Sequence, residues 1–274
     1  MSGGADSLAL LILSVAVGFE TTAIHVDHGL RPGSDNEASF VESVTVRFGA
    51  SFVSESVLVD ASGDQNGNLE ARAREARYAV LPPDVATGHT ADDVAETVLL
   101  NLMRGSGLDG LSPLVTPGSL IRPIVALRRS ETLELCRQHG LTPFDDPMNH
   151  DPRFRRVRVR DEVLPLLNEV AEREVVPLLL RLADTVRDDV AALNALAVEL
   201  DPLSAAVLMA APIAIARRAV RAWLVESGVG DGHPPALAVI DRVLAVARGE
   251  MPRADLVDGW RVARTHQRLR LERI

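Results

Sequence analysis

The chain of 274 residues contains no lysine and a single cysteine, Cys136. All 29 basic residues are therefore arginines, so a cationic phosphate clamp must use an arginine, a backbone N–H group or a metal ion. A single cysteine excludes a disulfide framework and makes a reducing cytoplasm the expected location. Internal repeats and low-complexity tracts are also missing.

Long hydrophobic runs are missing as well. The run LALLILSVAV at residues 8–17 is too short to cross a bilayer, and no basic residues of a signal peptide precede it. We therefore expect no membrane partner. The length and the hydrophobic content of 47% are typical of a globular protein of one or two domains.

Positive charge is scarce in the first half of the chain. Residues 1–150 carry 10 arginines and 20 acidic residues, which give a net charge of −10. Residues 151–274 carry 19 arginines and 18 acidic residues, which give a net charge of +1. The total of −9 argues against a uniformly basic nucleic-acid-binding protein. Of the two halves, the second is better suited to contact a polyanion.

Strand and helix patterns alternate in the first half. Strands are predicted at residues 21–26, 51–59, 84–88 and 120–124, and helices at residues 35–48, 69–81, 90–103 and 130–139. Thr90 and Asp93 have the spacing of a capping box. This alternation predicts an α/β fold with a doubly wound, mainly parallel sheet.

The strand pattern stops at residue 161. Helices are predicted at residues 162–200, 213–226 and 236–247, and Asp258-Gly259 in the alternating tail predicts a small hairpin. We expect a first domain at residues 1–155. A mainly helical second domain at residues 156–274 would include the C-terminal hairpin.

The segment SGGADS is the first candidate site. It consists of Ser2, Gly3, Gly4, Ala5, Asp6 and Ser7. Glycines let backbone N–H groups converge on phosphate oxygens, and the following helix would direct its positive end at the same anion. Asp6 is a candidate Mg²⁺ ligand. The Gly-Lys-Ser/Thr ending of a Walker loop is missing, and a plain glycine turn before a helix is the alternative.

A second polar segment, HVDHGLRPGSDNEA at residues 25–38, follows a predicted strand. It would lie at the carboxyl edge of the sheet, where open α/β sheets bind ligands. Asp27, His28 and Arg31 offer an acid, a base and a cation at this edge. For any one of them, a polar loop with a Pro-Gly turn is the alternative.

The third segment, GHTADDVAETVLLNLMRGSGLDGL at residues 88–111, carries a histidine and three acids. His89 follows a predicted strand, and Asp92, Asp93 and Glu96 lie in the first two turns of a helix. Asp93 and Glu96 share a face, so they could hold a metal ion or accept a proton. Alternatively, the acids only stabilise the start of the helix through its dipole. A zinc metalloprotease is excluded because there is no His-Glu-x-x-His motif.

The fourth segment, DPMNHDPRFRRVRVR at residues 146–160, places five arginines within eight residues. Arginine forks bind phosphate bidentately, so this run predicts a phosphate or RNA contact, with a solvated linker as the alternative. Arg74 and Arg77 share a predicted helix and either face the site or pair with nearby glutamates. Cys136 has the spacing of a core position in a helix.

These segments, together with NLEARAREARY, IRPI and the run at residues 145–165, resemble in order the tRNA(Ile)-lysidine synthase family over about residues 2–167. The hexapeptide alone is shared by many N-type ATP pyrophosphatases, whereas the later segments are more specific.

The resemblance implies an ATP-dependent ligase with an N-type ATP pyrophosphatase fold. Such an enzyme adenylates the C2 oxygen of the wobble cytidine in a tRNA(Ile) with a CAU anticodon. The amino group of free L-lysine then displaces AMP and gives lysidine. The loop at residues 2–7 would wrap the pyrophosphate of ATP, and Asp6 would help to hold Mg²⁺. The implied catalytic residues are Asp6, His89, Asp93, Glu96, Arg74 and Arg156.

Two departures from the family pattern bear on this expectation. Family members have a strand before the glycine loop, whereas this sequence begins at Met1, directly before the loop. We therefore expect a shortened or late-started form whose first strand is missing. The sequence after about residue 230 is only weakly similar, so residues 161–248 would make most contacts with RNA.

Several alternatives stay open on the sequence alone. Another enzyme of the ATP pyrophosphatase group is one of them, but tRNA thiolases carry sulfur on cysteines, often a pair, and an ammonia-using synthetase would not explain the arginine run. A non-catalytic protein that binds nucleotide or RNA is an alternative of a different class. A homodimer is compatible with the sequence, although no pattern predicts one.

Overall fold

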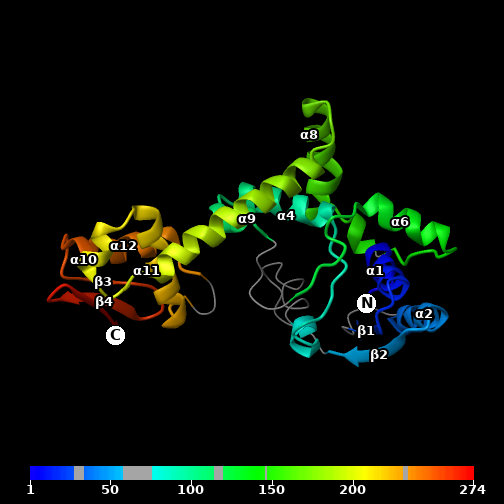
Figure 1. Cartoon of the computed structure of the whole chain (residues 1–274), viewed down its shortest axis with the longest axis horizontal. Coiled ribbons are helices and arrows are strands. Elements are labelled where there is room, and N and C mark those ends of the chain that lie inside the picture. Colours follow the sequence, from blue (N-terminus) through cyan, green and yellow to red (C-terminus); the bar gives the residue numbers. More distant parts are fainter. Residues whose placement is uncertain (28–33, 58–75, 114–119, 146, 231–233) are drawn as a thin grey trace. The chain divides into compact units, whose positions relative to one another are not determined.

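The computed structural model describes residues 1–27, 34–57, 76–113, 120–145, 147–230 and 234–274 (Figure 1). The chain forms two compact units, Met1–Asp184 and Thr185–Ile274. Among the described residues, none of the helices combines the length and the apolar character that a membrane crossing needs.

The first unit contains a short parallel sheet and several helices. Its elements are α1 (Ala5–Ala16), β1 (Thr22–Asp27), α2 (Ser34–Arg47), β2 (Ser51–Ser56), α4 (Ala91–Met103), α5 (Leu108–Leu111), α6 (Arg129–Gln138), the 3-10 turn η1 (Pro147–His150), α7 (Arg155–Arg158), the π-helical turn η2 (Val159–Val163) and α8 (Leu164–Ala171). The helix α9 (Val176–Val198) contains the division between the two units.

Strands β1 and β2 pair in parallel, from Thr22 opposite Ser51 to Asp27 opposite Ser56. The predicted strand at residues 84–88 is reduced to one parallel bridge between Ala86 and Ile121. Proline has no N–H group to donate to a ladder, and Pro123 lies two residues beyond this bridge. The predicted class, a mainly parallel α/β sheet with helices followed by a helical region, is confirmed.

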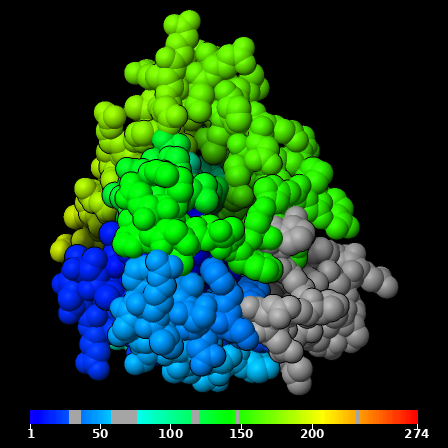
Figure 2. Space-filling view, turned by 90° about the vertical axis from the view of Figure 1, so that its right-hand side faces the viewer, coloured from blue at the N-terminus to red at the C-terminus, as the bar shows by residue number. Residues whose placement is uncertain are grey.

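Three groups of buried side chains hold the first unit together, the smallest of them Val94, Val98 and Ala183. One joins α1, β1, α2 and α6 through residues such as Leu8, Ala23 and Val44. Another joins α4 to η2, α8 and the start of α9, and it includes Ala95 and Val159. Figure 2 shows the green surface of the α6 region directly against the blue surface of the N-terminal elements, which agrees with the packing of α1 on α6.

The packing of α8 and α9 explains where the units divide. Residues 156–184 fall in the first compact unit because they pack on α4. The domain boundary at residue 155 stays a prediction. The predicted helix at residues 162–200 is also interrupted. Glu172 takes a left-handed conformation with φ of 52°, which ends α8 before α9 begins at Val176.

The second unit packs helices on a small antiparallel sheet. Its elements are α10 (Ala205–Ala210), α11 (Ile213–Glu226), α12 (Leu237–Arg248), β3 (Arg253–Asp255), β4 (Trp260–Thr265) and β5 (Arg268–Arg273). Helix α12 contacts both β3 and β4 and also packs on α10 and α11 (Figure 1). Val220, Leu224, Ile240 and Val262 are fully buried between these elements.

The predicted turn at Asp258-Gly259 is confirmed, and it joins β3 to β4. A second hairpin joins β4 to β5 through His266 and Gln267, whose φ angles are 47° and 63°. Sequence reasoning missed this turn because glycine or asparagine usually occupies such positions.

Candidate active site

The glycine loop (Ser2–Ser7) lies beside β1 and leads directly into α1. The amino group of Met1 donates to the carbonyl of Ile24 in β1. Gly3 has a φ of 67°, a conformation that glycine adopts without strain, and Gly4 is the N-cap of α1. The first N–H groups of a helix lack partners within the helix, and they carry its positive dipole end. The loop therefore offers backbone donors to an anion such as a phosphate group.

Gly88 fixes the distance between this loop and the start of α4. A Cβ atom on Gly88 would lie 2.8 Å from the backbone oxygen of Asp6 and 3.1 Å from the backbone nitrogen of Ser7. Any larger residue would push the loop away. The absence of a side chain here lets the backbone at residue 88 lie directly against the glycine loop.

Asp6 is held from α6. The hydroxyl of Thr132 donates to Asp6 Oδ1 at 2.6 Å, and Arg129 Nε lies 3.8 Å from Asp6 Oδ2. Burial raises the pKa of Asp6 above its ordinary value, although the Thr132 hydrogen bond and the Arg129 charge oppose this. Among the described residues, no group of three His, Cys, Asp or Glu side chains could form a metal cage. A single carboxylate beside a phosphate loop nevertheless suits Mg²⁺, which usually binds one or two carboxylates together with substrate phosphates.

Asp93 caps the first turn of α4. Its Oδ2 accepts hydrogen bonds from the backbone nitrogen and the hydroxyl of Thr90 at 2.8 and 3.0 Å, so the predicted capping box is confirmed. Its Oδ1 accepts from Arg156 at 2.9 Å and from Arg129 at 3.3 Å. The same side chain thus caps the helix and binds two arginines.

Glu96 is fully buried, with 0% of its side chain exposed. Its carboxylate accepts from Arg129 Nη1 at 3.1 Å, Arg156 Nε at 2.5 Å and Arg160 Nε at 2.7 Å. Burial alone would raise the pKa of Glu96, but the Arg160 hydrogen bond and the charges of Arg156 and Arg129 outweigh it and lower the pKa. Glu96 therefore stays ionised and holds three guanidinium groups in place.

The first turn of α6 connects the glycine loop to α4. The backbone nitrogen of Arg129 donates to Asp92 Oδ2 at 2.8 Å, and Arg128 binds Asp92 through two bonds of 3.1 Å. Arg128 also pairs with Glu174. We call the group that meets here the acid–arginine cluster; its members are Asp6, Asp93, Glu96, Arg129, Arg156 and Arg160.

Four of the predicted site residues, Asp6, Asp93, Glu96 and Arg156, belong to this cluster. His89 lies one residue before the N-cap Thr90, and its Nδ1 is 2.8 Å from the hydroxyl oxygen of Thr87. Arg74, His28 and Arg31 lie outside the described residues.

The arginine run does not form one patch directed at a phosphate chain. Arg156 and Arg160 bind Glu96, whereas Arg153 binds Asp151 and Arg158 binds Glu162. These acids lie outside the run of five arginines, so the sequence spacing alone did not reveal the pairs.

Sequence reasoning did not single out Arg128, Arg129 and Thr132. One signal was available, because two adjacent arginines begin a helix at the end where its dipole disfavours positive charge. The carboxylates of Asp6, Asp92, Asp93 and Glu96 supply the compensation in the structure.

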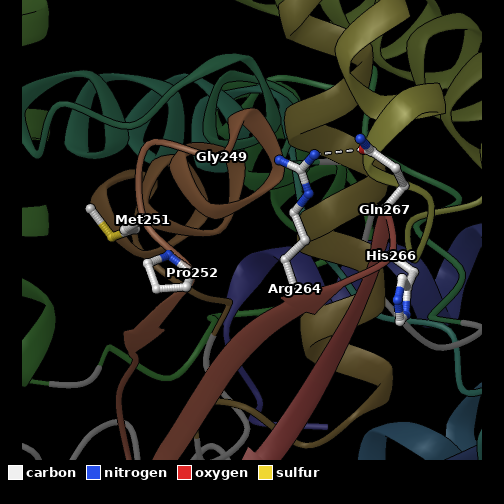
Figure 3. Close-up of a pocket in the computed structure, with 6 residues that line it drawn as sticks. All are labelled: Gly249, Met251, Pro252, Arg264, His266 and Gln267. Carbon is white, nitrogen blue, oxygen red and sulfur yellow. Dashed lines mark hydrogen bonds between the residues drawn. The ribbon is translucent and has the colours of Figure 1, made fainter.

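The second unit contains a separate open hollow of about 470 Å³, lined by Gly249, Met251, Pro252, Arg264, His266 and Gln267 (Figure 3). Arg264 donates to the backbone oxygen of Ala247 at 2.8 Å and to Gln267 Oε1 at 2.7 Å (dashed in Figure 3). A cation at the carboxyl end of α12 stabilises that helix end. This hollow contains no acidic residue, and we assign its arginine a structural role.

Comparisons with known proteins identify the family. The PP-loop domain family model matches residues 1–167, and the TilS substrate binding domain model matches residues 203–270. The sequence is 43% identical to the tRNA(Ile)-lysidine synthase of Nocardia farcinica over 265 residues, which cover 91% of this chain and 82% of that protein. The chain belongs to the tRNA(Ile)-lysidine synthase family. A second family member, from Mycobacterium tuberculosis, is 39% identical over 268 residues, covering 91% of this chain and 81% of its own length.

A solved structure outside the tRNA(Ile)-lysidine synthase family has a similar fold. It is the U34-tRNA thiolase NcsA from Methanococcus maripaludis with its [4Fe-4S] cluster, at a TM-score of 0.53 and 18% identity, covering 69% of this chain and 70% of that one. Iron–sulfur clusters are held by several cysteine thiolates. This member of the lysidine synthase family has only Cys136, which is buried in α6 with its thiol 3.6 Å from the backbone oxygen of Ala5.

Proposed function

We propose that this chain catalyses ATP-dependent formation of lysidine in a tRNA(Ile) with a CAU anticodon. The C2 oxygen of the wobble cytidine attacks the α-phosphorus of ATP, and pyrophosphate leaves. The amino group of free L-lysine then attacks C2, AMP leaves, and the new C–N bond gives lysidine after the nitrogen loses a proton. The observation that carries this proposal is the acid–arginine cluster, which lies against the glycine loop in a chain of this family.

The glycine loop would bind the phosphates of ATP. Its backbone N–H groups and the N-terminus of α1 suit the departing pyrophosphate, and they need no movement to do so. Asp6 is the carboxylate best placed to share a Mg²⁺ ion with those phosphates. When bound, this ion neutralises charge that develops on the phosphate oxygens.

The arginines of the acid–arginine cluster would stabilise the charge on the α-phosphate during adenylation and on AMP when it leaves. Preorganised donors give this kind of stabilisation without reorganisation cost. Glu96 has both oxygens occupied by arginines, so we assign it a positioning role within the predicted reacting centre. His89 would contact the reacting groups. Both oxygens of Asp93 accept from Thr90, Arg129 and Arg156, so Asp93, like Glu96, would position the arginines of the reacting centre.

The remaining partners follow from the reaction. Residues 203–270, which match a substrate-binding domain model, would contribute to tRNA binding. A single buried cysteine is in keeping with a protein that works in a reducing cytoplasm.

The two alternative functions, a thiolase and a non-catalytic binding protein, require different features of the chain. A thiolase needs accessible cysteines, whereas burial raises the pKa of the Cys136 thiol and keeps it in its unreactive form. A non-catalytic protein would bind tRNA or nucleotide without releasing pyrophosphate.

The decisive experiment is incorporation of labelled lysine into unmodified tRNA(Ile) with ATP and Mg²⁺. We expect incorporation that requires ATP, together with pyrophosphate release before lysine is added. The matched control is the same tRNA with uridine at the wobble position, which should accept no lysine. Folded protein that binds this tRNA but releases no pyrophosphate would contradict the proposal and favour the non-catalytic alternative.

A further inference from the structure

The arginines at residues 155–160 divide between two faces of the helical segment formed by α7 and η2. Arg156 and Arg160 are four residues apart and both reach Glu96. Arg155 and Arg158 are three residues apart and face a separate pocket of about 300 Å³ on the outside of α4. The two arginine pairs therefore serve different sites.

This pocket, which we call the α4–α7 pocket, has an apolar floor. Leu100, Met103, Val159 and Val163 line it. Met103 is 60% exposed, so its apolar side chain is accessible to a partner. A π-helical turn such as η2 often occurs at functional sites, and here it supplies both valines.

The rim of the α4–α7 pocket is positively charged. Arg104, Arg155 and Arg158 lie around it with one acid, Glu162, which pairs with Arg158. Within the described part of the chain, Arg155 makes no side-chain hydrogen bond or ion pair, and it is exposed. Because residues 1–150 carry a net charge of −10, a local excess of arginine on this unit indicates an anionic partner.

The position of the pocket relates it to the acid–arginine cluster. Glu96, Leu100 and Met103 lie on one face of α4, at spacings of four and three residues. Seven residues of helix at about 1.5 Å each place the pocket about 10 Å from Glu96. That distance corresponds to about three stacked nucleotides at about 3.4 Å each.

We propose that the α4–α7 pocket binds an unstacked base of the tRNA substrate, within a few nucleotides of the reacting cytidine. The base packs its flat face on Met103 and Val163, and Arg155 and Arg104 contact the neighbouring phosphates. Single-stranded RNA is recognised in this way, by stacking of splayed bases combined with cationic contacts to the backbone. This inference rests on the proposed function, since it takes tRNA as the polyanion.

Direct binding of unmodified tRNA(Ile) to the full chain tests the inference. Arg155→Ala should weaken binding several-fold and reduce the slope of log K against log salt by about one, as expected for one lost phosphate contact. The matched control is Arg137→Ala, which removes an exposed arginine of α6 that pairs with Glu134 and should leave both values unchanged.

A pair of variants at the exposed Met103 tests the base contact. Met103→Glu should raise the Kd about tenfold, whereas Met103→Phe, which keeps an apolar stacking surface, should bind as the wild type does. The rate of lysine incorporation by Arg137→Ala should equal that of the wild type.

The inference would be overturned if Arg155→Ala and Met103→Glu bound tRNA with the same Kd and the same salt slope as Arg137→Ala. That result is distinct from failure of the proposed function, which shows as no lysine incorporation by the wild type.

Discussion

Glu96→Gln removes one negative charge from the centre of the acid–arginine cluster and leaves the size of the side chain unchanged. Three guanidinium groups then lose their shared carboxylate, and the NH₂ group of the glutamine, a hydrogen-bond donor, faces guanidinium N–H groups that are also donors. Breaking a buried ion pair by removing one partner costs about 3–5 kcal/mol of the free energy of unfolding. The three arginine side chains are 25–31% exposed, so water compensates in part and we expect the lower end, about 3 kcal/mol.

This loss is large against the total free energy of unfolding of a typical domain, about 5–15 kcal/mol. Urea denaturation at pH 7 measures it directly. The matched control is Glu134→Gln, which breaks an exposed ion pair with Arg137 and should change the midpoint little. If Glu96→Gln unfolds at the same urea concentration as Glu134→Gln, the stabilising role assigned to Glu96 is wrong.

The same variant has a predictable pH dependence. The pKa of Glu96 is lowered in the folded protein, so its stabilisation is fully present above the ordinary value of 4.5 and is lost as pH falls through the folded pKa. The difference in free energy of unfolding between wild type and Glu96→Gln should therefore stay constant above pH 4.5 and shrink below it. A difference that grows as the pH falls would refute the assignment.

Three further substitutions test other parts of the site. Because burial raises the pKa of Asp6, its ionised form destabilises the fold at neutral pH. Asp6→Asn should therefore unfold at a higher urea concentration than the wild type at pH 7, and this difference should disappear as the pH falls toward 3.8. The variant should also lose pyrophosphate release. Gly88→Ala should lower the free energy of unfolding by about 1–3 kcal/mol and raise the KM for ATP, because the added Cβ meets the backbone of the glycine loop. In the control Gly107→Ala, the added Cβ meets nothing within 4 Å, so the KM should stay unchanged. Cys136→Ala should keep lysine incorporation, measured with labelled lysine, and a complete loss in folded protein would mean that the thiol takes part in the reaction.

Features that depend on nearby residues were predictable from the sequence. The capping box of Thr90 and Asp93 needs only a spacing of three, and the helix after the glycine loop follows directly from its apolar run. The meeting of Asp6 with Asp93 and Glu96 was predictable from family resemblance.

Features that depend on distant packing were not predictable in this way. Thr132 and Asp6 are 126 residues apart, and their hydrogen bond exists because α6 packs on α1. The partners of the arginine run could not be read from the sequence either, since Glu96 lies 60 residues before Arg156. The left-handed Glu172 that ends α8 carries no glycine signal.

The cations of the acid–arginine cluster are all guanidinium groups, and this choice has a consequence for the substrate. A lysine in the same position would begin to lose its charge near pH 10, which is also where the amino group of free lysine loses its proton. Arginine stays charged throughout this range. Alkaline conditions that increase the nucleophilic form of the substrate therefore leave the arginine charge around Glu96 intact. The titration of the nucleophile is then separate from that of the cations proposed to stabilise the phosphate charge.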